Sequence, residues 1–322
     1  MAPLQTNFSY QTTLSSKELR ANPQHIRPAA YETIAVSNFP MNSSFNLFQE
    51  EARAYLNYLR VPRFELMETF QDWSNEAAKV PDDVAIAAEY FGISSHEKTL
   101  IVTPKKTSAA QNQFWGFNTT QTSVPVTNLL NPEISFLKRS KLNYYELLDL
   151  LMVRFVNAPD SPNRSEIARP ADTCNTDEQT INNLSVTKFD LMHRFIRLWR
   201  KTGWKMWELD LLIRNQKIGT RTINGEILLD DNTLVNLKRF KQLQEKLKLP
   251  FETMLAFYGD INREVRIKAD KSDVKIDPLY KNLFQNIALT NPVDDFFVGV
   301  KDDDTLKDLD SSIIFGINVI EA

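Results

Sequence analysis

Apolar residues along this chain recur at helical spacing, in pairs of runs separated by very short breaks. The clearest pair is His193–Asp210, HRFIRLWRKTGWKMWELD. Before the break, Phe195, Ile196 and Trp199 fall on one stripe of a helix. The run stops at Thr202-Gly203, and a second amphipathic run opens two residues later. This pattern predicts one helix, a tight turn and a second helix folded back on the first.

The same break occurs six times, and each copy has the same order of residues. A helix end is followed by one apolar residue, which we call the plug, and then by a residue that starts the next helix. In five of the six copies a glutamate stands three positions after that starting residue. The six turns are Leu59–Glu65, Phe91–Glu97, Lys141–Glu146, Thr202–Glu208, Leu247–Thr253 and Phe315–Glu321. Their plugs, which we expect to be buried between helices, are Val61, Ile93, Leu142, Trp204, Leu249 and Ile317.

The physical chemistry of helix ends explains this order. A helix commonly ends on a residue in the left-handed conformation, and Gly92, Gly203 and Gly316 suit that position. The next helix begins with unsatisfied N–H groups, and Ser94 with Glu97 has the spacing of a capping box. Two of the other turns carry proline at the start of the second helix, where no N–H is needed.

The fold class that follows is all-α. Only 8 of the 322 residues are glycine, where average usage of about 7% would give about 23. We expect an irregular array of antiparallel helix pairs joined by tight turns, with long polar loops at Lys105–Thr127 and Asn157–Asp177 and one short β-hairpin, on an Asn-Gly turn, at Arg221–Leu228. The expected organisation is an arm that packs on the helices (1–45), a first helical subdomain (46–157), a loop (158–186) and a second helical subdomain (187–322). Because the last turn opens a helix that the sequence does not complete, we expect a piece of a longer protein.

Composition narrows the function classes. The net charge of −3 predicts no general attraction to nucleic acid. No apolar run approaches the 18 or so residues of a membrane span, and the first twenty residues lack the apolar core of a classical signal peptide. The single cysteine, Cys174, excludes an internal disulfide and a cysteine-rich zinc site.

Residues suited to catalysis are sparse. The three histidines, His25, His96 and His193, lie far apart and outside any metal-ligand spacing, and Cys174 has no nucleophile signature around it. Most of the paired acids precede helical runs, where they would cap helices, and Asp302–Asp304 lacks the glycine and distal glutamate of a calcium loop. We therefore predict no catalytic residue, no cofactor and no metal site.

A group of basic residues beside tryptophans is the strongest candidate for binding. Arg194, Arg197 and Lys201 fall on one stripe of the predicted helix, opposite the stripe that holds Trp199. Cations interleaved with aromatic rings can stack on nucleic acid bases. In the predicted helix, however, the cations and the tryptophan fall on opposite sides. We expect a solvated or subunit-facing basic face, and this is the possible interaction face of the chain.

Several long stretches resemble one known family. They are Asn46–Phe70 (NLFQEEARAYLNYLRVPRFELMETF), Cys174–Ile213 (CNTDEQTINNLSVTKFDLMHRFIRLWRKTGWKMWELDLLI), Leu247–Ile261 (LKLPFETMLAFYGDI) and Pro278–Pro292 (PLYKNLFQNIALTNP). In this order they resemble the A component of the insecticidal toxin complex (Tc) family. The likeness begins near Leu19–Ile26 and runs to the end of the chain, but covers only a small part of a family member.

The resemblance implies an assembly. Such subunits form a homopentamer whose helical outer shell surrounds a central channel, and the channel is driven into a target membrane to deliver a toxic enzyme. The stretch resembled here belongs to the shell. Its expected partners are the rest of the same subunit, the neighbouring protomers and the B–C toxin component, with membrane contact only through other parts. The implied location is that of a secreted or cell-surface bacterial toxin.

The leading hypothesis is therefore a non-enzymatic structural segment of a Tc-type shell, within a pore-forming, toxin-translocating assembly. The second hypothesis is a glycan- or receptor-binding module of a host-targeting toxin, using the loops around Trp115 and the basic face. The third is an unrecognised hydrolase, which no motif favours.

Overall fold

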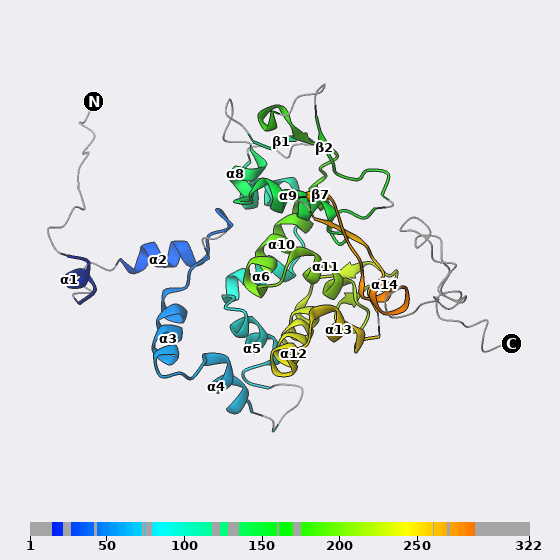
Figure 1. Ribbon diagram of the computed structural model, residues 1–322. Helices are drawn as coiled ribbons and strands as arrows, with labels where there is room; N and C mark the ends of the chain where they lie inside the picture. The colour runs from blue at the N-terminus through cyan, green and yellow to red at the C-terminus, as the bar shows by residue number, and fades with distance from the viewer. Residues whose placement is uncertain are drawn as a thin grey trace, which may run out of the picture.

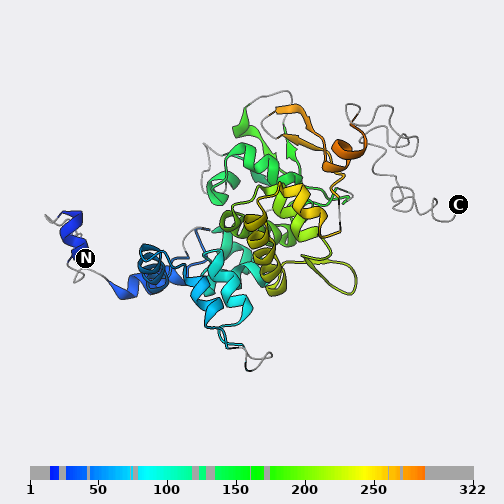
Figure 2. The same cartoon turned by 60° about the horizontal axis from the view of Figure 1, so that its bottom comes forward.

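The chain is mostly helical, with a few short strands. The computed structural model describes residues 15–21, 27–41, 44–72, 74, 79–117, 123–127, 135–159, 161–169, 175–259, 261–268 and 271–286. In this part of the chain, helices α5 to α13 gather into one body, and α1 to α3 lie to one side of it (Figures 1 and 2). None of the helices described is long and apolar enough to cross a membrane.

Two helices, α10 and α12, have 17 residues each, and the other described helices have 12 or fewer. The helices are α1 (Ser16–Ala21), α2 (Pro28–Ala35), α3 (Leu47–Tyr58), α4 (Arg63–Thr69), α5 (Asp83–Tyr90), α6 (Ser95–Val102), α7 (Ser108–Trp115), α8 (Phe136–Ser140), α9 (Tyr144–Met152), α10 (Val186–Thr202), α11 (Met206–Arg214), α12 (Asp231–Leu247), α13 (Phe251–Ala256) and α14 (Leu279–Phe284). The strands are β1 (Val124–Pro125), β2 (Ile167–Ala168), β3 (Thr180–Ile181), β4 (Thr220–Arg221), β5 (Ile227–Leu228), β6 (Arg266–Lys268) and β7 (Lys271–Ile276).

Short polar side chains start most of the helices. Asp82, Ser94, Asn143 and Asp230 each accept a hydrogen bond from a backbone N–H in the first turn of the helix that follows. In α9 the bond is reciprocal, because Glu146 also accepts from the backbone N–H of Asn143 (2.8 Å). Each cap satisfies N–H groups that the helix itself leaves unpaired.

Five of the six predicted turns lie within the described residues, and their backbones follow one scheme. The residue before the plug has a positive φ of 54–72°, the plug follows, and the next residue is the N-cap of the second helix. We call this unit a corner. The residues with positive φ are Arg60, Gly92, Lys141, Gly203 and Lys248. At two corners the plug's own N–H closes the helix end, from Ile93 to the carbonyl of Ala88 (2.8 Å) and from Val61 to that of Leu56 (3.0 Å). The sixth turn, with Ile317, lies outside the described residues.

The buried apolar residues form one core. The cluster runs from Met41 to Leu255 and includes side chains from both expected helical subdomains, 46–157 and 187–322. Helix α10 lies across its centre and contacts α6 and α7, while α12 packs on α5 (Figure 1). The two halves of the chain are therefore packed on a shared core.

The described residues also form three small sheets. In the first, β3 lies between β1 and β2, with Ile181 opposite both Val124 and Ile167. The second is the predicted hairpin of β4 and β5, in which Arg221 pairs with Ile227. Its loop is longer than the Asn-Gly dipeptide: the N–H of Gly225, at φ 81°, donates to the carbonyl of Thr222. The third, β6 with β7, falls in a charged stretch where we predicted no strand.

One expectation about loops needs correction, and the arm contains helices of its own. The arm, 1–45, contains the helices α1 and α2 and then a segment that reaches the core, where Met41 is buried. The polar stretch Lys105–Thr127 contains α7, because Thr107 caps the run that ends on Trp115. Predictions that concern His25, Cys174, Asp302–Asp304 and the run after residue 286 lie outside the described residues.

Candidate functional site

The predicted basic face belongs to α10, and most of it points inward. Arg194 and Arg197 are 3% and 1% exposed, while Lys201 is half-buried. The expectation of a solvated face is therefore wrong for the two arginines. The reason lies in their partners, since a buried cation is stable only where acceptors or anions surround it.

Arg194 joins the end of one helix to the start of another. Its Nε donates to the carbonyl oxygen of Ile101 (2.5 Å) and one Nη donates to that of Val102 (3.2 Å), both in the last turn of α6. The same side chain donates to the carbonyl of Leu229, just before α12. Asp190, one helical turn earlier, lies 3.6 Å from its guanidinium.

Arg197 ties the N-terminal segment to the core. Its two Nη atoms donate to the carbonyls of Asn38 (2.5 Å) and Met41 (3.1 Å). Its Nε donates to Nε2 of His193 (2.8 Å), and its guanidinium lies 3.9 Å from the carboxylate of Glu97. These contacts use donors on all three nitrogens of the side chain.

The next two cations on α10 reach two more helix ends. Arg200 donates to the carbonyls of Ser140 (2.5 Å) and Lys141 (3.0 Å), where α8 stops. Lys201 donates to the carbonyl of Gly92 (3.2 Å), at the corner after α5, and pairs with Glu97 (3.0 Å). Since the last carbonyls of a helix have no partner within it and carry partial negative charge, they are natural acceptors for buried cations. Two side chains of the predicted interaction face, Arg194 and Lys201, therefore hold α6 and α5 against α10, and the neighbouring Arg200 holds α8.

The ionisation of these groups follows from burial. Burial lowers the pKa of Arg197 to about 10, which still leaves the guanidinium protonated at neutral pH. Burial also lowers the pKa of His193 well below 6.5, and the charges of Arg197 and Arg194 lower it further. His193 is thus neutral, stacked on Phe114 at 4.6 Å, which is a structural role.

Aromatic residues proposed for ligand contact are also internal. Trp115 is fully buried, and its Nε1 donates to the carbonyl of Phe189 (3.2 Å) and to Oε1 of Gln111 (3.1 Å). A buried indole offers no surface on which a sugar ring could stack. Among the described residues, Trp115 and the two buried arginines of the basic face therefore lend no support to a glycan site.

The plugs differ in burial. Ile93, Leu142 and Trp204 are buried, whereas Val61 and Leu249 are half-buried. Trp204 packs between Phe91 and Phe240, at ring distances of 6.2 and 5.9 Å, and its Nε1 donates to Gln244 (3.0 Å). This plug therefore joins the α10–α11 corner to α5 and α12.

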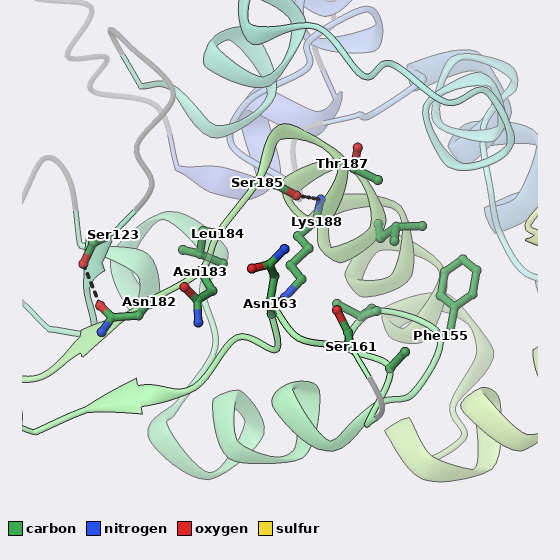
Figure 3. A pocket seen from close by; sticks show the side chains of 13 residues that line it. Ser123, Phe155, Ser161, Asn163, Asn182, Asn183, Leu184, Ser185, Thr187 and Lys188 are labelled. Atoms are coloured by element: carbon green, nitrogen blue, oxygen red, sulfur yellow. Dashed lines mark hydrogen bonds between the residues drawn. The ribbon is translucent and has the colours of Figure 1, made fainter.

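One open pocket of about 680 Å³ lies beside the start of α10 (Figure 3). Asparagine, serine and threonine are the most frequent residues in its lining, together with Lys188 as a cation, but most of the exposed surface is apolar and comes from neighbours such as Phe155 and Leu191. The ammonium of Lys188 donates to the carbonyl of Asn163, to Oγ of Ser165 (2.9 Å) and to Oδ1 of Asn157 (3.3 Å). Its three donors are thus occupied by the protein itself.

The chemistry that this pocket can perform is limited. Among the residues that line it there is no carboxylate, imidazole or thiol that could act as a general acid, base or nucleophile. Within the described part of the chain, no three His, Cys, Asp or Glu side chains are grouped as metal ligands. The pocket was not predicted, because its walls come from segments 20 to 60 residues apart that no sequence spacing connects.

A second buried ion cluster was also missed. Asp210 on α11 accepts from the N–H of Phe155 (2.8 Å) and pairs with Arg214 (3.0 Å), which in turn holds Glu264 (2.7 Å). Burial raises the pKa of Asp210. The i, i+4 spacing of Asp210 and Arg214 was visible in the sequence, as was that of Asp190 and Arg194.

Comparison of the chain with known protein families, with curated proteins and with solved structures finds no match in any of the three.

Proposed function

We propose that this chain is a non-enzymatic structural segment of the helical outer shell of a Tc-type toxin A subunit. The observation that carries the proposal is the use of the α10 cations: Arg194, Arg200 and Lys201 each bind the carbonyl end of another helix. When the cations of one helix bind the ends of other helices rather than solvent, they fix those helices in place. Such an arrangement suits a rigid structural segment.

The corners support the same function. Five helix ends share one backbone scheme, and their plugs are buried or half-buried. An array of antiparallel helix pairs built in this way forms a wall that resists bending, because each pair is fixed at its turn as well as along its length. Four sequence stretches that resemble the Tc family contain three of these corners.

The test is the size and assembly of the native product. An antibody raised against this chain should detect, in the source cells, a polypeptide several times longer than 322 residues that runs as a homopentamer under native conditions. A native product of 37.2 kDa would contradict the proposal.

The second candidate, a glycan-binding module, is favoured only by the pocket beside the start of α10, where amides and hydroxyls stand on a mostly apolar surface and could bind the hydroxyl groups of an uncharged ligand. A glycan array with the wild-type chain and with Asn163→Ala tests it. Binding that disappears in the variant would support this function, and an array without signal would remove it.

A further inference from the structure

Helix α3 is attached to the body through its polar side. Arg53 donates from Nε to one oxygen of Glu89 (2.7 Å) and from Nη2 to the other (3.0 Å), and Gln49 donates to the same carboxylate (2.7 Å). The side chain of Glu89, on α5, is only 4% exposed. Burial alone would raise the pKa of Glu89, but the hydrogen bonds from Arg53 and Gln49 outweigh it and lower the pKa, so the carboxylate is charged.

The apolar stripe of α3 faces away from these contacts. Phe48, Tyr55 and Leu59 are 75%, 74% and 64% exposed, and no residue of the helix is buried. With Ala52 they follow the spacing i, i+4, i+7 and i+11, which is one line along a helix. We call these four residues the outer stripe.

An exposed stripe of this kind is costly unless something covers it. Aromatic side chains of this size carry about 150–250 Å² each, so the outer stripe and Tyr58, which is 87% exposed, offer on the order of 500 Å². Single exposed apolar residues are ordinary, but a contiguous patch of this size marks an interaction surface. It supplies most of the 800 Å² or so that each partner buries in a standard interface.

We propose that the outer stripe of α3 pairs with the outer stripe of a second copy of this chain, in antiparallel orientation. In that register Phe48 of one copy faces Leu59 of the other, and Ala52 faces Tyr55. Each large side chain at the middle of the pair therefore meets a small one, which helical packing requires for close approach. The same surface is used by both copies, as a twofold interface demands.

The rim of the stripe suits this arrangement. Glu51 and Tyr58 are both exposed and flank the stripe on one side, two turns apart. In an antiparallel pair, the same side of the stripe on one copy lies next to that side on the other copy. Glu51 of each copy then lies beside Tyr58 of the other, and its carboxylate can accept a hydrogen bond from the Tyr58 hydroxyl. A twofold pair is closed, so in a ring-shaped assembly it joins two rings rather than neighbours within one ring.

This inference does not depend on the toxin assignment, because it rests on the orientation of α3 alone. The test is sedimentation of the whole chain from about 1 to 200 µM. The wild-type chain should shift from 37.2 kDa to twice that mass within this range, and the double variant Phe48→Glu/Tyr55→Glu should remain monomeric. Ile223→Glu is the matched control, since Ile223 is fully exposed on the β4–β5 loop and should leave association unchanged.

Thermal unfolding of the same variants separates the outcomes. If the stripe points outward, the double variant melts within about 2 °C of the wild-type chain measured as a monomer. A wild-type chain that stays monomeric throughout would overturn the proposal, and so would an association that the double variant leaves intact. A large fall in melting temperature in the double variant would also overturn it, because the stripe would then be packed within its own chain.

Discussion

Helices α10 and α3 are both amphipathic, yet they are oriented in opposite ways. Helix α10 buries most of its apolar stripe and also two of its cations, Arg194 and Arg197, so that Arg197 is less exposed than Trp199 on the opposite side. Helix α3 places Arg53 against the body and leaves Phe48 and Tyr55 in solvent. The difference shows that the side of a helix that packs inward depends on the hydrogen-bond acceptors and charged groups that the body presents to it. Glu89 and the open carbonyl ends of α5, α6 and α8 are acceptors, and they select cations.

The largest expected effect concerns the inward cations of α10. Replacing Arg197 by alanine should cost about 3–5 kcal/mol of unfolding free energy, because Glu97 would be left buried with one cation and two carbonyls would lose their donor. Urea unfolding measures it. Arg239→Ala, at an exposed ion pair on α12, is the control and should change stability by less than about 1 kcal/mol. Equal losses in the two variants would show that Arg197 is solvated.

The plug of the central corner should matter almost as much. Trp204→Ala removes a buried indole that contacts Phe91 and Phe240, and it should cost about 3–5 kcal/mol in the same measurement. Val61→Ala, at a half-buried plug, should cost clearly less. A loss below about 1 kcal/mol for Trp204→Ala would mean that the indole is not part of the core.

A smaller effect depends on pH and again concerns α10. The pKa of His193 is lower in the folded chain than its ordinary value of about 6.5, since burial and the charges of Arg197 and Arg194 oppose protonation. The unfolded chain therefore binds the proton first, and stability falls as the pH drops below about 6.5, by up to about 1.4 kcal/mol for each pH unit. His193→Gln should flatten that slope between pH 6.5 and 5. An unchanged slope would assign the dependence to other groups.

The smallest change in the stability of the whole fold is expected for a substitution on α3. Arg53→Met removes the bidentate contact with Glu89, so amide hydrogen exchange in Leu47–Tyr58 should speed up about tenfold while the body keeps its protection. Arg60→Met, an exposed neighbour, is the control. Loss of protection throughout the body would show that α3 is part of the core.

Local rules made the corners predictable from the sequence. Gly92 and Gly203 have the positive φ that their position predicted, and Ser94 accepts the hydrogen bond from the N–H of Glu97 that their spacing predicted. Arg60, Lys141 and Lys248 adopt the same positive φ although they are not glycine. The identity of these residues gave no reason to predict this conformation. The hairpin at Arg221–Leu228 was predicted for a similar reason, because turn chemistry acts over a few residues.

Orientation was not predictable in the same way. The alternation of faces on α10 and α3 was visible, but the acceptors that bury Arg194 come from Ile101, Val102 and Leu229, which are remote in sequence. The pocket beside Lys188 was missed for the same reason. A prediction from hydrophobicity alone places cations at the surface. That prediction is wrong for the arginines of α10, because the carbonyl ends of other helices lie around them.

The most direct test of the opposite orientations is a comparison of two single variants in urea unfolding, Arg197→Ala on α10 and Phe48→Glu on α3, both measured on the monomeric chain. We predict that the charge removed from α10 costs at least about 3 kcal/mol and that the charge added to α3 changes stability by less than about 0.5 kcal/mol. The reverse order, with Phe48→Glu the more damaging substitution, would contradict the account.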